Sequence, residues 1–235
     1  MVTLAQANEL RLAQTEVRRL VEDRMMQIID YLASRPSLTA EQFRNSLISQ
    51  TNLVVSQYGE IAASMAAEWY EDIRLSEIGS SFSASPAQSP YGADAVEGMV
   101  RRASGTLFDE VPDLAAVMRT VTSKAGKYVL GAARETIRRN TFRDDKANGW
   151  KRVTRPSSCD FCRMLAGRGG VYKRETVLFA SHHKCNCAAV PSFDPTAPEV
   201  DVRAYEASVR TTKMTPQQRA EHNARVRSWI STFMK

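Results

Sequence analysis

Hydrophobic positions in the first half of the chain follow the spacing of amphipathic helices. Between residues 4 and 34 the apolar side chains recur at steps of three, four and seven residues, which places them on one face of a helix. These positions are Leu10, Val17, Val21, Met25, Ile28 and Leu32. We expect this helix to end before Pro36, because proline lacks an amide donor and disfavours helical geometry in the residue before it.

A second long helix is predicted from Thr39 onward. Thr39 and Gln42 have the spacing of a capping box, in which each side chain bonds to the backbone amide of the other residue. The apolar face then continues to about Leu75, through Phe43, Leu47, Thr51, Val54, Tyr58, Ile61, Met65 and Trp69. Two such helices with a short joint bury their apolar faces by packing antiparallel. The pattern therefore predicts an N-terminal helical hairpin over residues 1–78.

The middle of the chain divides into a linker and a helical segment. Residues 79–92 are rich in Ser, Pro and Gly, a composition typical of turns and linkers. The helical pattern resumes near Ala93 and again after Pro112, with a stripe at Leu114, Val117, Val121, Ala125, Tyr128 and Ala132. Residues 93–146 are accordingly expected to form a helical, basic segment.

The periodicity changes near Trp150. Short strands are indicated at residues 151–155 and 171–172, separated by a glycine-rich turn, and residues 188–193 read as extended chain. This pattern predicts a small α+β module over residues 147–195. The fold class is therefore mainly α, a long antiparallel helical hairpin or bundle followed by this small module.

The last segment, residues 196–235, is predicted to be an irregular tail followed by a helix. Thr215, Pro216 and Gln218 have the spacing of a helix start, with Thr as the cap, Pro in the first turn and Gln bonding back to the cap.

Soft metal-binding side chains gather in the C-terminal module. All four cysteines lie between residues 159 and 187, as Cys159 and Cys162, then Cys185 and Cys187 after His182 and His183. Thiolates and imidazoles at this spacing are ligands of tetrahedral zinc. Six donors exceed the four that zinc needs, so spacing does not decide which are used; Cys159, Cys162, His182, Cys185 and Cys187 are the candidate ligands. A closed set of four ligands predicts a structural zinc site, because catalytic zinc keeps a position for water.

Two other interpretations of the cysteines remain open. The side chains could form a hydrogen-bonded turn without metal, or two disulfides or a redox pair. Disulfides are rare in reducing compartments, and nothing at the N-terminus resembles an export signal. A redox Cys-x-x-Cys does not need the second group of His and Cys residues.

Charge is concentrated in the middle of the chain. The net charge is +6, and residues 101–174 hold seventeen Lys and Arg against seven Asp and Glu. A basic segment of this kind is typical of proteins that work beside nucleic acid. The candidate nucleic-acid contacts are Arg134, Arg138, Arg139, Arg143, Lys151 and Arg152. No base-reading motif accompanies them, so phosphate contacts without sequence preference are expected, and the short apolar runs exclude a membrane span.

Residues 150–193 carry motifs of a known family. These are Trp150-Lys-Arg-Val-Thr, Cys159-Asp-Phe-Cys162-Arg-Met-Leu, Arg168-Gly-Gly-Val-Tyr172, and His182-His-Lys-Cys185-Asn-Cys187-Ala-Ala-Val-Pro191. On them the chain resembles the Mu F-like minor head proteins of tailed bacteriophages, most closely those of phages that infect actinobacteria. The resemblance covers about 45 residues.

The resemblance implies a minor capsid protein that acts in head assembly next to the portal. It would lie inside the capsid of the virion after assembly in the host cytoplasm. Its implied partners are the portal, scaffold or major capsid protein, with sequence-independent contact to packaged DNA as a further expectation and no membrane. Some long family members carry a fused protease or toxin, but the tail after the motif is too short for either.

Other functions remain as alternatives. A zinc-containing DNA-binding protein would use the basic segment. A metal-dependent nuclease would need an open metal position and a further ligand, and a serine maturation protease would need a free histidine. The chain has three histidines, two of them in the zinc motif. We therefore expect no enzymatic activity.

Overall fold

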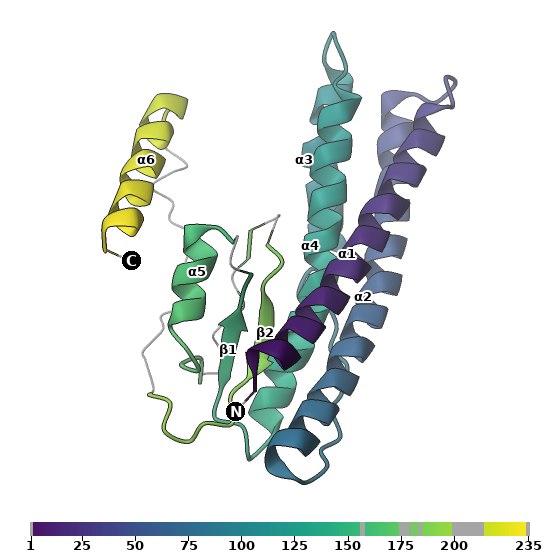
Figure 1. Ribbon diagram of the computed structural model, residues 1–235. Helices are drawn as coiled ribbons and strands as arrows, with labels where there is room; N and C mark the ends of the chain where they lie inside the picture. Colours follow the sequence, from purple (N-terminus) through teal and green to yellow (C-terminus); the bar gives the residue numbers. More distant parts are fainter. Residues whose placement is uncertain are drawn as a thin grey trace.

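The computed structural model describes residues 2–155, 158–173, 179, 181–182, 185–198 and 214–233. Two long helices begin the chain, α1 (Leu4–Ala33) and α2 (Ala40–Ile78), and they run antiparallel side by side (Figure 1). The predicted capping box of Thr39 and Gln42 is present, and Thr3 and Gln6 form a second one at the start of α1. The mainly helical fold class is confirmed.

A third long helix completes the helical body. It is α4 (Leu114–Arg143), which packs against both α1 and α2. The shorter helix α3 (Ala93–Ala103) and the 3-10 turn η1 (Ser104–Phe108) precede it and pack against α2 and α4. The core between the long helices is formed by residues such as Leu10, Val21, Leu47, Val121 and Val129, all fully buried.

The buried face of α2 differs from the predicted stripe in its second half. Ile61 is 54% exposed, whereas Ala62, Ala66 and Tyr70 are buried. In this half of α2 the buried face follows the small alanines rather than the largest apolar side chains. The spacing of large apolar residues along the sequence does not reveal a buried helix face that is formed by alanines.

Residues 79–92 are not a free connection. The backbone amides of Ser85 and Ala87 donate to side chains of α4, Asn140 and Thr136, both at 2.9 Å. Gly131 permits the approach, since a Cβ there would lie 3.1 Å from the Tyr91 ring. The segment therefore lies as an extended strap along α4.

The small sheet has two antiparallel strands, β1 (Trp150–Val153) and β2 (Ala188–Pro191), with Trp150 opposite Pro191. The segment predicted at residues 171–172 contributes only one bridge, from Tyr172 to Trp150. Trp150 is buried, and its ring stacks on those of Tyr172 and Phe179 at centroid distances of 4.2 and 5.5 Å. Strand β2 packs on α4 and α1, which ties the module to the helical body (Figure 1).

Two further helices lie outside the helical body. Helix α5 (Asp160–Gly167) packs against β1. Helix α6 (Pro216–Phe233) begins with the predicted pair, in which the amide of Gln218 donates to Thr215 and that of Thr215 to Gln218. Within the part of the chain that is described, none of the helices combines the length and apolar character of a membrane span.

Candidate metal centre

Helix α5 presents the first two cysteines. Cys159 is the N-cap residue of α5, and Cys162 lies in its first turn. Residues three apart on a helix lie on the same side, so both sulfurs face the same space. The pair thus lies at the start of a helix.

The second group of donors comes from the chain that leads into β2. The sulfur of Cys159 lies 3.1 Å from Nε2 of His182, and that of Cys162 lies 3.9 Å from the same nitrogen. The sulfurs of Cys162 and Cys185 are 3.7 Å apart. The remaining cysteine, Cys187, bonds through its sulfur to the hydroxyl of Thr154 at 3.3 Å. His183 lies outside the described residues.

These separations can be compared with those of a tetrahedral zinc site. With zinc–sulfur bonds of about 2.3 Å and zinc–nitrogen bonds of about 2.0–2.1 Å, two sulfurs would lie about 3.8 Å apart and a sulfur and a nitrogen about 3.6 Å apart. The Cys162–Cys185 distance of 3.7 Å matches, and the two cysteine–His182 distances of 3.1 and 3.9 Å bracket the second value. Cys159, Cys162 and His182 thus lie near the separations of a tetrahedral site, whereas among the described residues no fourth donor lies within 4.8 Å of all three.

The five candidate ligands, Cys159, Cys162, His182, Cys185 and Cys187, are called the Cys/His cluster below. Their donor atoms form two triads of mutual neighbours, one with Cys159 and His182 and one with Cys185 and Cys187. The cluster could therefore hold a metal ion, and Cys162 is a donor common to both triads.

Burial is graded across the Cys/His cluster. Cys159 and His182 are exposed, whereas Cys162, Cys185 and Cys187 are buried. Hydrogen bonds from Cys162 and Cys187 hold the pKa of Cys185 far below its ordinary value, and the positive charge of Arg134 acts in the same direction. Hydrogen bonding with Cys185 raises the pKa of Cys162, and the pKa of Cys187 is raised as well. The buried side therefore favours one thiolate, at Cys185, which is the form that binds metal.

Comparison with known proteins bears on the whole chain. The family model described as VG15 protein matches residues 1–212. The chain belongs to the VG15 family. No curated protein and no solved structure matches it. VG15 is a phage virion-associated family, so the expectation of a phage virion protein is confirmed at that level. The narrower resemblance to Mu F-like minor head proteins stays a prediction.

The six basic residues predicted to meet nucleic acid do not form one surface in this VG15 family member. Arg134, Arg138 and Arg152 are buried. Arg138 binds Glu135 at 2.7 Å, and Arg134 donates to backbone carbonyls of the Cys/His cluster. A phosphate cannot reach guanidiniums placed in this way, so these three are corrected from surface contacts to internal ones.

The other three basic residues are more accessible. Arg139 and Arg143 are exposed, and Lys151 is half-buried with its ammonium bonded to the carbonyl of Val2. Arg139 also binds Glu135, at 2.7 Å. The charge count of this segment thus overstates the positive surface that it offers, because periodicity and composition do not tell a buried arginine from an exposed one.

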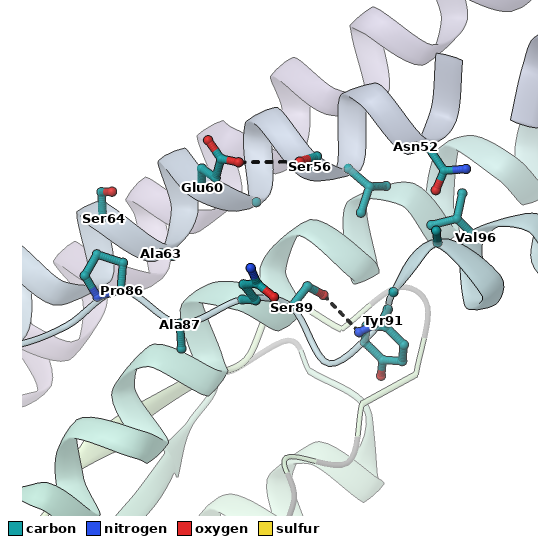
Figure 2. A pocket seen from close by; sticks show the side chains of 15 residues that line it. Asn52, Ser56, Glu60, Ala63, Ser64, Pro86, Ala87, Ser89, Tyr91 and Val96 are labelled. Carbon is teal, nitrogen blue, oxygen red and sulfur yellow. Dashed lines mark hydrogen bonds between the residues drawn. The ribbon is translucent and has the colours of Figure 1, made fainter. Parts of the chain in front are cut away.

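A groove of about 580 Å³ lies elsewhere on this VG15 family member, between α2 and residues 86–93 (Figure 2). Its α2 wall includes Asn52, Ser56, Glu60 and Ser64, and the facing wall includes Pro86. Glu60 accepts from the Ser56 hydroxyl at 3.4 Å. None of the Cys/His cluster lines this groove. The groove is therefore separate from the candidate metal centre.

Proposed function

We propose that the protein is a minor head protein that acts in head assembly next to the portal, inside the capsid, with a structural zinc ion in its Cys/His cluster. The observation that carries this proposal is the family match over residues 1–212, because the family is phage virion-associated. The motif resemblance to Mu F-like minor head proteins narrows the role to head assembly. The proposed role is structural and does not include catalysis.

Zinc is the metal that best suits the donor set. Sulfur and imidazole donors in a tetrahedral arrangement are typical of zinc, whereas Mg²⁺ and Ca²⁺ prefer oxygen. We assign Cys159, Cys162, His182 and Cys185 as the four ligands, since Cys162 lies 3.9 Å from His182 and 3.7 Å from Cys185 and so joins the two triads. The four donors do not all lie within 4.8 Å of one another, so Cys185 has to move toward Cys159 and His182 when zinc binds. Cys187 is left to bond Thr154 and to donate its amide to the sulfur of Cys185 at 3.5 Å.

A closed set of ligands suits a bracing role. Zinc would tie helix α5 to the chain before β2, two segments with few large apolar side chains between them. The small hydrophobic cluster here consists of Cys162, Cys185 and Cys187 with Phe161 and Phe179 against them. The strands of the module belong to the main core, but this small cluster adds little burial where α5 meets the chain before β2. The metal would brace that junction.

The assignment of the fourth ligand predicts a difference between two serine variants. Cys185→Ser is expected to lose bound zinc, whereas Cys187→Ser is expected to retain one zinc per chain with a modest loss of affinity. Elemental analysis of both proteins, purified under reducing conditions, measures the difference. Loss of zinc in Cys187→Ser with retention in Cys185→Ser would reverse the assignment.

The helical body offers candidate surfaces for docking in the head. Large apolar side chains are exposed along α1 and α2: Leu4, Leu12, Leu20, Met26 and Tyr31 on the first, and Leu53, Ile61 and Leu75 on the second. Scattered single apolar residues are normal on a surface. If the protein docks next to the portal as proposed, the exposed apolar side chains of α2 are positions at which substitution tests that contact.

Particle content tests the proposed function. The phage is grown with wild-type protein, with Ile61→Asp, or with Ser49→Asp, and the copies per purified head are measured by quantitative immunoblot. Ser49 is exposed on the same helix, about 120° around its axis from Ile61, and receives the same charge. We expect wild-type and Ser49→Asp to be incorporated in few copies and Ile61→Asp to be reduced several-fold, with unchanged thermal stability. Absence of the wild-type protein from heads would refute the proposed function.

A further inference from the structure

A buried arginine from the helical body reaches the Cys/His cluster. Arg134 lies on α4 and is 2% exposed. Its Nε donates to the carbonyl of Cys187 at 3.0 Å and its Nη2 to that of Cys185 at 2.8 Å. The guanidinium therefore holds both ends of the Cys-x-Cys turn. A third contact, at 3.4 Å, joins Nη1 to the hydroxyl of Ser181, next to His182.

The same turn is held from a second helix. Asn186, between the two cysteines, accepts from Nη1 of Arg18 on α1 at 2.9 Å, and Arg18 is also bonded to Glu22 at 2.7 Å. Two helices of the body thus fix the backbone and the side chain of one three-residue turn. The position of the Cys185 sulfur is set by this turn, so the helical body positions a proposed zinc ligand.

Charge gives Arg134 a second role. Burial of a guanidinium is costly unless an opposite charge lies close to it. Among the described residues, no ion pair joins Arg134 to a carboxylate. Its close contacts are the carbonyls of the Cys-x-Cys turn, the hydroxyl of Ser181, and the ring of Phe179, 4.8 Å from its Cζ. Cysteines bind zinc as thiolates, so three thiolates and one histidine around a dication leave a net charge of about −1. The zinc-loaded cluster is a suitable counter-charge for the guanidinium, and also for that of Arg152, whose Nη1 lies 3.9 Å from the sulfur of Cys185.

We propose that Arg134 is a positioning residue of the metal centre, which couples zinc binding to the docking of the C-terminal module on α4. Its guanidinium holds the Cys185–Cys187 turn in the conformation that binds metal, and its positive charge offsets the negative charge of the metal-bound thiolates. Coupling between two events is reciprocal. Zinc therefore strengthens the contact between module and α4, and that contact strengthens zinc binding. This inference rests on the structural zinc of the proposed function.

Zinc affinity in three variants of the full chain tests the proposal. Arg134→Met removes the charged guanidinium but keeps a side chain of similar length. Arg134→Lys keeps the positive charge but replaces the planar guanidinium, with its several N–H donors, by a single ammonium. Arg139→Met is the matched control, because Arg139 lies on the same helix with its side chain 60% exposed. Affinity is measured by competition with a chromogenic chelator at fixed pH, and the rise in Tm on adding zinc is measured in parallel.

We expect Arg134→Met to weaken zinc binding by about 10- to 100-fold, the range typical of residues that orient metal ligands. Arg134→Lys is expected to lose affinity several-fold, and Arg139→Met to match wild type. The zinc-dependent rise in Tm should shrink in the Arg134 variants. A residue that only stabilised the fold would instead lower the Tm of the zinc-free and zinc-loaded proteins equally.

The outcomes separate this inference from the proposed function. Wild-type protein that binds no zinc would refute the structural zinc itself. Wild-type protein that binds zinc, with Arg134→Lys of equal affinity and an equal rise in Tm, would overturn the role of Arg134 alone. The lysine variant decides this even where Arg134→Met fails to fold.

Discussion

Cys162→Ser is expected to abolish zinc binding and to unfold residues 154–187, between β1 and β2, while the two strands and the three long helices remain folded. Cys162 is the donor shared by both triads of the Cys/His cluster, so no set of four ligands without it keeps the observed neighbours. Structural zinc contributes on the order of 10–16 kcal/mol in small zinc-finger peptides, far more than a loop-rich segment gains by burial. Elemental analysis should find no zinc, and limited proteolysis should cut within residues 154–187.

The control for this experiment is Met164→Leu, on the same helix and of similar volume. It is expected to keep its zinc and its resistance to protease, because volume-conserving apolar changes are tolerated. Helical circular dichroism should fall only slightly in Cys162→Ser, since α1, α2 and α4 do not depend on the metal. A Cys162→Ser protein with wild-type zinc content would contradict the proposed site.

The second large effect is expected at a buried ion pair between α2 and the end of α4. Arg74 and Asp144 have side chains 5% and 0% exposed, and their charged atoms are 2.7 Å apart. The hydroxyl of Tyr70 and the amide of Lys146 also donate to this carboxylate. Asp144→Ala should lower the free energy of unfolding by about 3–5 kcal/mol, because it leaves a buried guanidinium without its partner. Urea denaturation measures the change.

Asp145→Ala is the matched control, one residue further along. The Asp145 side chain is 79% exposed, and within the described part of the chain its ion pair is with the exposed Lys146, so its removal should change the stability by less than about 1 kcal/mol. The double variant Arg74→Met/Asp144→Leu should recover much of the loss, since it removes both charges together. A loss in Asp144→Ala no greater than in Asp145→Ala would show that the pair contributes little.

The helical part of the fold could be predicted from the sequence because its signals are local. Apolar spacing and the Thr39–Gln42 pair mark α1 and α2 within a residue or two. The burial of Ala62 and Ala66 in place of Ile61 was not predictable in this way. It depends on how closely α4 approaches, which is a property of the packed helices and not of one segment.

The candidate site could be predicted only as a set of residue types. Spacing identified the cysteines and His182, and the structure brings them together. Arg134 was assigned to a nucleic-acid surface, because a basic run does not reveal which of its members point inward. Its bonds to the carbonyls of Cys185 and Cys187 join residues about fifty positions apart, and no local pattern records such a contact.

The pairing of β1 with β2 has a consequence for how the module assembles. Val153 lies opposite Ala188, so the ladder closes a loop that contains every member of the Cys/His cluster. Closing a long loop has an entropic cost, and this cost is met by strand pairing on the surface of α4. An incoming ion then has only short segments left to order. Strand pairing thus brings the two groups of cluster residues close together along the chain's fold before a metal ion is bound.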